Sequence, residues 1–262
     1  MADNRSPAAD PFIARLRLMT ALDEAQLDAL SDLLANTRTY PSDRDIVKAG
    51  ETSSDLHVLL SGWACRYKLL PDGRRQIVAL LLAGDPCDLD GILVRKFDTS
   101  VLTLTTVEVA VVSRDALLSL GRRYPPLADL LLWLTTLNNA VMSERINSLG
   151  RRTAREKVAH LFCELMIRLV GAGCQSGDSF GLPLTQGEIG DTTGLTAVHV
   201  NRVLQGLRSD GIIALRDQRL TVLDWPLLKA IAGFDAGYLH LSGMRSAPVE
   251  HAAFGPVSRQ AG

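Results

Sequence analysis

The chain has 262 residues, of which 47% are hydrophobic and 22% charged, which is typical of a soluble globular protein with one large domain or two ordinary ones. Its formal net charge of −1 gives no global sign of nucleic-acid binding. Residues 1–150 hold 16 Lys and Arg against 19 Asp and Glu, and residues 151–262 hold 12 against 10. The C-terminal part is therefore the more cationic one.

Several classes of protein are disfavoured by the sequence. No window of about 18 uninterrupted apolar residues could cross a membrane, and the opening MADNRSPAADPF lacks the pattern of a secretory signal. The four cysteines are scattered with no CxxC pair, so we expect neither a structural zinc site nor a disulfide framework, and a reducing cytoplasm is the simplest compartment. These cysteines are Cys65, Cys87, Cys163 and Cys174.

An enzyme is also disfavoured, since no nucleophile elbow, HExxH motif, P-loop or paired catalytic carboxylates are present. The histidines are dispersed and suggest no triad: His57, His160, His199, His240 and His251. We predict no catalytic residues and no metal site. The run of acids at 85–90 is read as solvated rather than as metal ligands.

Within the first 124 residues the predicted secondary structure changes from helices to short strands. Leucines at helical spacing predict a short helical region over 11–36, and short apolar runs between turn residues follow from about 45 to 118. Asp72-Gly73 separates two such runs, which is the strongest short signal for a hairpin. The spacing of the strands favours an antiparallel roll or barrel over βαβ units.

A long helix is predicted over 126–149, which contains no Pro or Gly after Pro126. Its apolar residues alternate in steps of three and four: Leu127, Leu130, Leu134, Leu137 and Val141. This rhythm suits packing against a second copy of the helix in a dimer, and it suits packing on the helix's own domain equally well. A second helix follows Gly150, and 171–183 is read as a loop.

Two short helices joined by a tight turn are predicted after that loop. Thr185 and Glu188 stand in a capping-box relationship, Gly194 interrupts the first helix, and Thr196 can cap the second. This is the arrangement of a helix-turn-helix. The second helix has one apolar stripe, formed by Val200, Val203, Leu204 and Leu207. The segment 212–222 reads as a hairpin with a charged tip, which would form a wing.

The face opposite the stripe carries chemistry that suits base edges in DNA. Arg can bind O6 and N7 of guanine, Asn or Gln can bind adenine, and an apolar group suits the thymine methyl. Thr185 and Gln186 begin the preceding helix, where donors commonly meet a phosphate. The predicted DNA-contacting set is Thr185, Gln186, Thr196, Val198, His199, Asn201, Arg202 and Gln205. The plain alternative is a solvated helix pair.

The string LTQGEIGDTTGLTAVHVNRVLQGLRSDGII resembles the DNA-binding signature of the Crp/Fnr family of bacterial regulators. The matching residues are Thr185, Glu188, Ile189, Gly190, Thr196, Val200, Arg202, Leu204 and Leu207. The spacing of turn residues resembles that between the strands of the family's eight-stranded sensor roll. These turn residues are Gly50-Glu51, Leu60-Ser61-Gly62, Asp72-Gly73 and Gly84-Asp85. The resemblance leaves out the N-terminal dozen residues and the tail from about 233.

The resemblance implies roles for single residues. Arg202 matches the family's recognition-helix arginine, which contacts guanine. Val198 stands where many members have a base-reading glutamate, and Ala197 where some have a further arginine. These departures predict a DNA half-site unlike the best-known ones, with Asn201 and His199 as contributors to the altered specificity.

The resemblance also bears on the signal. In cyclic-AMP-responsive members an arginine holds the cyclic phosphate. Asp98 stands at that position here, so we expect no cyclic-nucleotide cofactor, although Arg95 or Lys96 could substitute. Iron–sulfur members need clustered N-terminal cysteines, and residues 1–64 contain none, so we expect no cluster. The effector-pocket candidates are Asp85, Cys87, Asp88, Asp90, Arg95, Lys96, Asp98 and Thr99.

Three further points about the signal stay open. His57 is the one candidate for an axial haem ligand, but a lone histidine is more often structural. Cys65 and Cys87 could form a redox pair if they face each other, yet a buried free cysteine commonly serves as a small hydrophobe. The sequence indicates neither the effector nor the operator, nor whether the protein activates or represses transcription.

The sequence thus predicts an α+β protein: an N-terminal antiparallel β-roll that resembles a cyclic-nucleotide-binding jelly roll, a long dimerisation helix and a C-terminal winged helix-turn-helix. The expected divisions are 1–124, 125–150, 151–232 and a partly flexible tail, 233–262. The predicted function is a homodimeric regulator that binds double-stranded DNA at a near-palindromic site, contacts RNA polymerase and does not respond to cyclic AMP. The alternative is a small-molecule or redox sensor whose winged helix binds another protein.

Overall fold

The computed structural model describes residues 10–94, 96–173 and 177–241. Two helices open it, α1 (Pro11–Arg17) and α2 (Glu24–Leu34), within the region predicted as helical. The Asp10 side chain caps α1, and Asp23 forms a capping box with Gln26 at the start of α2. Both helices bury their apolar faces against the sheet that follows, which explains why this region is helical rather than loose.

Two antiparallel sheets form the predicted roll. The first has the order β1-β7-β3 and the second the order β2-β6-β4-β5. The bounds are β1 Thr37–Tyr40, β2 Asp45–Val47, β3 Asp55–Ser61, β4 Ala64–Leu69, β5 Arg75–Leu81, β6 Ser100–Thr103 and β7 Val107–Ser113. Asp72-Gly73 closes the β4–β5 hairpin, as predicted. An apolar cluster that includes Leu59, Val101 and Val109 fills the roll.

The roll has seven strands in the described part of the chain, and the expectation of eight is wrong there. The segment between β5 and β6 makes one isolated bridge, Val58 to Pro86, and a 3₁₀ turn, η2 (Leu89–Ile92). Pro86 has no N–H to continue a ladder. In addition, the Asp88 carboxylate accepts the His57 backbone N–H at 2.7 Å, a donor that a neighbouring strand would otherwise use.

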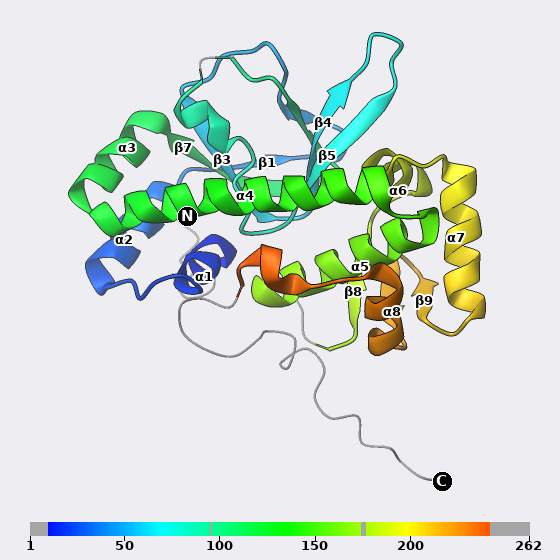
Figure 1. Cartoon of the computed structure of the whole chain (residues 1–262). Coiled ribbons are helices and arrows are strands. Elements are labelled where there is room, and N and C mark those ends of the chain that lie inside the picture. Colours follow the sequence, from blue (N-terminus) through cyan, green and yellow to red (C-terminus); the bar gives the residue numbers. More distant parts are fainter. Residues whose placement is uncertain (1–9, 95, 174–176, 242–262) are drawn as a thin grey trace.

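A short helix, α3 (Arg114–Arg123), leads into α4 (Pro125–Arg151), which crosses the whole molecule (Figure 1). Leu127, Leu130, Leu134 and Leu137 are buried on α4 against the same chain. Of the two interpretations of this stripe, packing on the helix's own domain is therefore the one that the structure shows. A different face of α4 leaves Leu132 and Ile146 exposed.

Beyond α4 the chain forms a second compact unit around α5 (Ala154–Gly171). The unit contains α6 (Gln186–Thr193), α7 (Ala197–Ser209), α8 (Trp225–Ala232) and a sheet of β8 (Ser179–Gly181), β10 (Arg219–Val222) and β9 (Ile213–Arg216) in that order. The predicted loop 171–183 thus contains a strand, β8, which pairs with the predicted wing hairpin.

The roll and this second unit share one apolar cluster. Ile77, Leu80 and Leu82 of the roll pack in the same cluster as Phe162 and Met166 of α5. At the β4–β5 hairpin, Nε of Arg75 donates to Asp191 of α6 at 2.8 Å. The second unit is therefore docked firmly against the roll in this structure.

The chain continues past α8 and turns back beneath α4 (Figure 1). Phe234, Leu239 and Leu241 are buried, and residues Ala236–Leu239 form a 3₁₀ turn, η3. The expected ordered start of the tail near 238–241 agrees with this. The expected flexibility of the last residues concerns 242–262, which lie outside the described residues. Within the described ranges, no helix is long and apolar enough to cross a membrane.

Candidate nucleic-acid interface

The two helices of the predicted helix-turn-helix are held together by a close backbone approach. A Cβ added at Gly190 would lie 2.4 Å from the carbonyl oxygen of Leu195, closer than a carbon atom can approach it. Leu195 N–H in turn donates to the Gly190 carbonyl at 3.0 Å. Gly194 ends α6 in the left-handed region with φ of 68°. Both glycines therefore have a steric reason to occupy these positions.

The capping residues lie where the sequence predicts. Thr185 caps α6 in a capping box with Glu188, and Thr196 caps α7 by accepting from His199 N–H. On α7, Val200, Leu204 and Leu207 are buried, while Val203 is half-buried against the same cluster. The apolar stripe of α7 is therefore the face that packs on the core, as predicted.

The opposite face of α7 is open to solvent. Val198 is 71% exposed, which is unusual for a valine in a packed domain. His199, Arg202 and Gln205 are exposed beside it. Asn201 is half-buried and donates from Nδ2 to Oε1 of Gln186 at 3.1 Å, so these two residues tie the start of α6 to α7.

Thr185 differs in its role from the predicted phosphate donor. Its hydroxyl donates to Oε2 of Glu188 at 2.8 Å, so its one donor is used inside the capping box. Gln186, the next residue, is exposed. At this helix start, the groups that could face an anion are therefore the Gln186 side chain and the first backbone N–H groups.

The wing presents two arginines directly opposite each other. Arg216 of β9 pairs with Arg219 of β10, and both are exposed. Asp217 and Gln218 form the turn between them, both with positive φ, as a two-residue hairpin requires. Like charges across a ladder are unfavourable without an anion between them. The tip of the wing therefore presents two exposed positive charges to solvent, and Nε of Arg219 also donates to the Ser179 hydroxyl at 2.9 Å.

The effector-pocket candidates do not gather in one pocket. Buried Asp85 forms ion pairs with Arg15 and, at 2.6 Å, with Arg168. Asp98 lies on the surface, paired with Lys68 at 2.9 Å. Asp90 and Thr99 are half-exposed, Lys96 is exposed, and Arg95 lies outside the described residues. A single site along 85–99 is therefore not what the fold builds from these residues.

His57 and Asp88 form a buried pair, with Nδ1 of His57 2.6 Å from Oδ2 of Asp88. This contact gives His57 a structural role, which is the more common one for a lone histidine. Cys65 and Cys87 lie in different apolar clusters and are free thiols. Burial raises the pKa of Cys65 to about 12 and that of Cys87 well above its usual value.

A chain of buried ion pairs, which the sequence does not reveal, links four segments. Arg15 of α1 and Arg168 of α5 bind Asp85, and Arg168 and Arg145 of α4 both reach Oε1 of Glu164 at 3.2 Å. Tyr238 of η3 donates to the other oxygen of Glu164 at 3.1 Å. The only hint of these ion pairs in the sequence is the four-residue spacing of Glu164 and Arg168 within an apolar helix. In the described ranges, no group of three or more His, Cys, Asp or Glu could hold a metal.

A sensor-like roll, a long helix and a winged helix-turn-helix with an exposed polar reading face together define a DNA-binding regulator. Comparison with known proteins agrees. Residues 37–124 match the model of the cyclic nucleotide-binding domain, and residues 156–231 match that of the Crp-like helix-turn-helix domain. The chain belongs to the Crp/Fnr family of transcription regulators.

Similar proteins of known function are bacterial regulators. The fumarate and nitrate reduction regulatory protein of Vibrio cholerae is 27% identical over 224 residues, covering 86% of this chain and 89% of the relative. Electron transport regulator A of Shewanella oneidensis is 28% identical over 226 residues, with the same coverage. Among solved structures, FixK2 from Bradyrhizobium japonicum matches with a TM-score of 0.70 and 27% identity, covering 77% of this chain and 98% of FixK2.

Proposed function

We propose that the protein acts as a homodimer that binds a near-palindromic DNA site through α7. The observation that carries this proposal is the exposed start of α7, where Val198 and Arg202 project from a helix whose other face is buried. Recognition helices contact base edges with their first turns. Asn201 and His199 complete the proposed reading edge, and Gln186 and Thr196 flank it.

The dimer contact is proposed on the exposed face of α4. Counting in steps of three and four from Leu132 gives a second stripe: Leu132, Thr135, Asn139, Met142, Ile146 and Leu149. Leu132 and Ile146 are 68% and 69% exposed, and a long helix with such a stripe is suited to a parallel partner helix. Asn139 would sit at a core position, where a polar residue fixes the register of a coiled coil.

Further parts of the proposal rest on the family. Residues 1–124 would sense a signal, 125–150 would dimerise, 151–232 would bind DNA in the cytoplasm, and RNA polymerase would be the partner for activation. We propose no iron–sulfur cluster, since clustered N-terminal cysteines are missing from the sequence. We also propose no response to cyclic AMP, because the Asp98 carboxylate at the position of the phosphate-binding arginine would repel a phosphate.

The test is a gel shift with a library of genomic fragments, followed by titration of the selected fragment at several salt concentrations. We expect selective binding that weakens steeply as salt rises, because lysine and arginine contacts to phosphates release counterions. Binding that is absent, or insensitive to salt, would contradict the proposal. Loss of DNA binding in Arg202→Ala with an intact dimer would rule out a wing and helix that serve protein contacts alone.

A further inference from the structure

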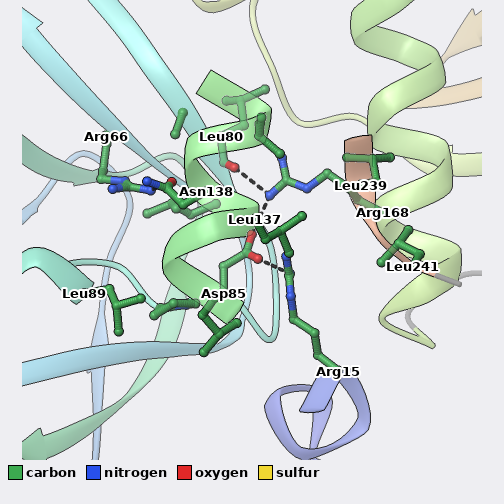
Figure 2. A pocket seen from close by; sticks show the side chains of 15 residues that line it. Arg15, Arg66, Leu80, Asp85, Leu89, Leu137, Asn138, Arg168, Leu239 and Leu241 are labelled. Carbon is green, nitrogen blue, oxygen red and sulfur yellow. Dashed lines mark hydrogen bonds and ion pairs between the residues drawn. The ribbon is translucent and has the colours of Figure 1, made fainter. Parts of the chain in front are cut away.

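A cavity of about 50 Å³ lies where the roll, α4, α5 and the C-terminal segment meet (Figure 2). Arg15 and Arg168 approach Asp85 from two sides, and Arg66 of β4 lies beside Asn138 of α4. Its remaining walls are apolar and include Leu137, Leu239 and Leu241. Arg15, Leu239 and Leu241 lie outside both regions that match the family models. These walls therefore come from segments that flank the two matched regions.

The cavity lining carries an excess of positive charge. It contains three arginines and one acid, Asp85, which leaves two formal positive charges. Glu164 binds Arg168 from outside the lining, but it also binds Arg145, so including this pair leaves the excess unchanged. Burial lowers the pKa of Arg15 by more than the Asp85 carboxylate raises it, and the neighbouring Arg168 lowers it further. Burial would also lower the pKa of Arg168, but Asp85 and Glu164 instead hold that pKa above its usual value.

Some of the arginine N–H donors in this lining also have no hydrogen-bond partner in the described part of the chain. Among the described residues, the buried Nε atoms of Arg15, Arg66 and Arg168 have no hydrogen-bond partner. A guanidinium has five N–H donors, and Arg15 donates to Asp85 from Nη1. Buried N–H groups of charged side chains are costly to leave unpaired. Arg15 and Arg168 are 9% and 8% exposed, so bulk solvent does not reach them freely.

The size and walls of the cavity select the ligand. One water molecule needs about 10–15 Å³ of such volume, so 50 Å³ accepts a group of about three to five non-hydrogen atoms. Arginines bind carboxylates with two parallel hydrogen bonds, and the leucine walls suit a short hydrocarbon part. We propose that this cavity binds a short-chain monocarboxylate, with Arg15, Arg66 and Arg168 as its anion-binding residues.

Such a ligand would bridge three parts of the chain. Arg168 belongs to the DNA-binding unit, Arg66 to the roll, and Leu239 to the segment that follows α8. A carboxylate that binds between them would change how the DNA-binding unit sits on the roll. This consequence rests on the proposed function, whereas the binding itself does not.

The binding test is isothermal titration calorimetry of the full chain with sodium acetate and sodium propionate, at an ionic strength held constant with chloride. We expect saturable binding with a Kd between about 10 µM and 1 mM, the range open to so small a ligand. Inorganic phosphate should compete at least tenfold less well, because the apolar walls cannot solvate it. Absence of saturable binding at 10 mM of either acid, or tighter binding of phosphate, would overturn the proposal.

Variants separate this site from general attraction of anions. Ala79→Leu fills the cavity without changing charge and should abolish binding, since Ala79 lines it. Arg66→Gln removes one positive charge and its guanidinium fork at a half-buried position and should weaken binding at least tenfold. Arg38→Gln, at an exposed arginine of β1, is the matched control and should bind as the wild type does. Equal binding by Ala79→Leu and the wild type would refute the site.

The regulatory consequence is tested by fluorescence anisotropy with a selected DNA fragment. Propionate at 10 mM should change the Kd for DNA at least fivefold in the wild type and not in Ala79→Leu. An unchanged Kd in the wild type would overturn the effector role. Absence of DNA binding under every condition would instead contradict the proposed function, because calorimetry reports on the carboxylate site without DNA.

Discussion

Arg168 and Asp85 join the two family-matched parts of the chain: Nη2 of Arg168 lies 2.6 Å from Oδ2 of Asp85, and both side chains are buried. Burial alone would raise the pKa of Asp85, but Arg15 and Arg168 outweigh it and hold that pKa below its usual range. Any movement of the DNA-binding unit away from the roll must separate these charges. The pair is therefore one of the contacts that hold the DNA-binding unit against the roll.

Asp85→Asn should destabilise the protein by about 3–5 kcal/mol, because it removes the buried carboxylate that Arg15 and Arg168 share and leaves Arg168 with Glu164 alone. Since the folded pKa of Asp85 is lowered, its contribution is complete above pH 3.8, the unfolded value, and is lost as pH falls through the folded pKa. Urea denaturation at pH 7 and below pH 4 measures both effects. Asp98→Asn removes an exposed pair and should cost no more than about 1 kcal/mol; equal losses for the two variants would contradict this account.

His160 should make stability depend on pH. Burial, followed by the charge of Arg152, lowers its pKa from 6.5 to about 4, so the folded state keeps it neutral between Phe234 and Tyr238. Its contribution is complete above pH 6.5 and falls as pH drops toward 4, by up to about 3 kcal/mol. Thermal or urea unfolding from pH 7 to 5 tests this, with His160→Gln as the comparison. The same slope in both proteins would show that His160 is not responsible.

Gly190→Ala should disrupt the helix pair, because its Cβ would lie 2.4 Å from a backbone oxygen that cannot move without opening the turn. Gly187→Ala on the same helix is the matched control, since the nearest atom to its Cβ is a Thr185 side-chain oxygen at 3.7 Å. We expect a loss of DNA binding and a lower unfolding midpoint for Gly190→Ala only. Similar behaviour of the two variants would argue against the close approach.

Ile146→Glu should convert the dimer to a monomer while the fold is retained, because this residue is exposed and would place a charge in the C-terminal half of the proposed seam. Leu93→Glu changes a residue that is 87% exposed but lies on the roll, and should leave the dimer intact. Analytical ultracentrifugation with circular dichroism distinguishes the outcomes. A dimer that survives Ile146→Glu would move the interface away from this face of α4.

Local patterns predict much of the fold. Capping residues such as Thr185 and Thr196, and the Asp72-Gly73 turn, act through neighbours a few residues away, so the sequence shows them directly. The strand β8 was missed because three residues carry too little periodicity, and it exists only by pairing with β10. The leucine stripe of α4 looks the same for either partner, and only the folded chain shows that the roll covers it.

The same division holds for the DNA-binding site: features set by local pattern could be predicted, and contacts set by tertiary packing could not. The buried and exposed faces of α7 follow from helical period, whereas the Asn201–Gln186 contact depends on the angle between two helices. The carboxylate cavity could not be predicted, since Arg15, Asp85 and Arg168 are far apart in sequence. Residues 85–99 do not line one common pocket in the structure, because the Asp85 and Asp88 side chains turn into the core to meet Arg15 and His57.

The most direct test of the central claim is a hydroxyl-radical footprint on a fragment selected from the genomic library. The account predicts two protected half-sites related by two-fold symmetry and separated by about 34–36 Å, one turn of DNA. Arg202→Ala should lose this protection, with DNA affinity reduced at least tenfold, while Arg208→Ala, another exposed arginine of α7, should keep it. A single asymmetric footprint, or the same footprint with Arg202→Ala, would contradict a dimer that reads DNA through α7.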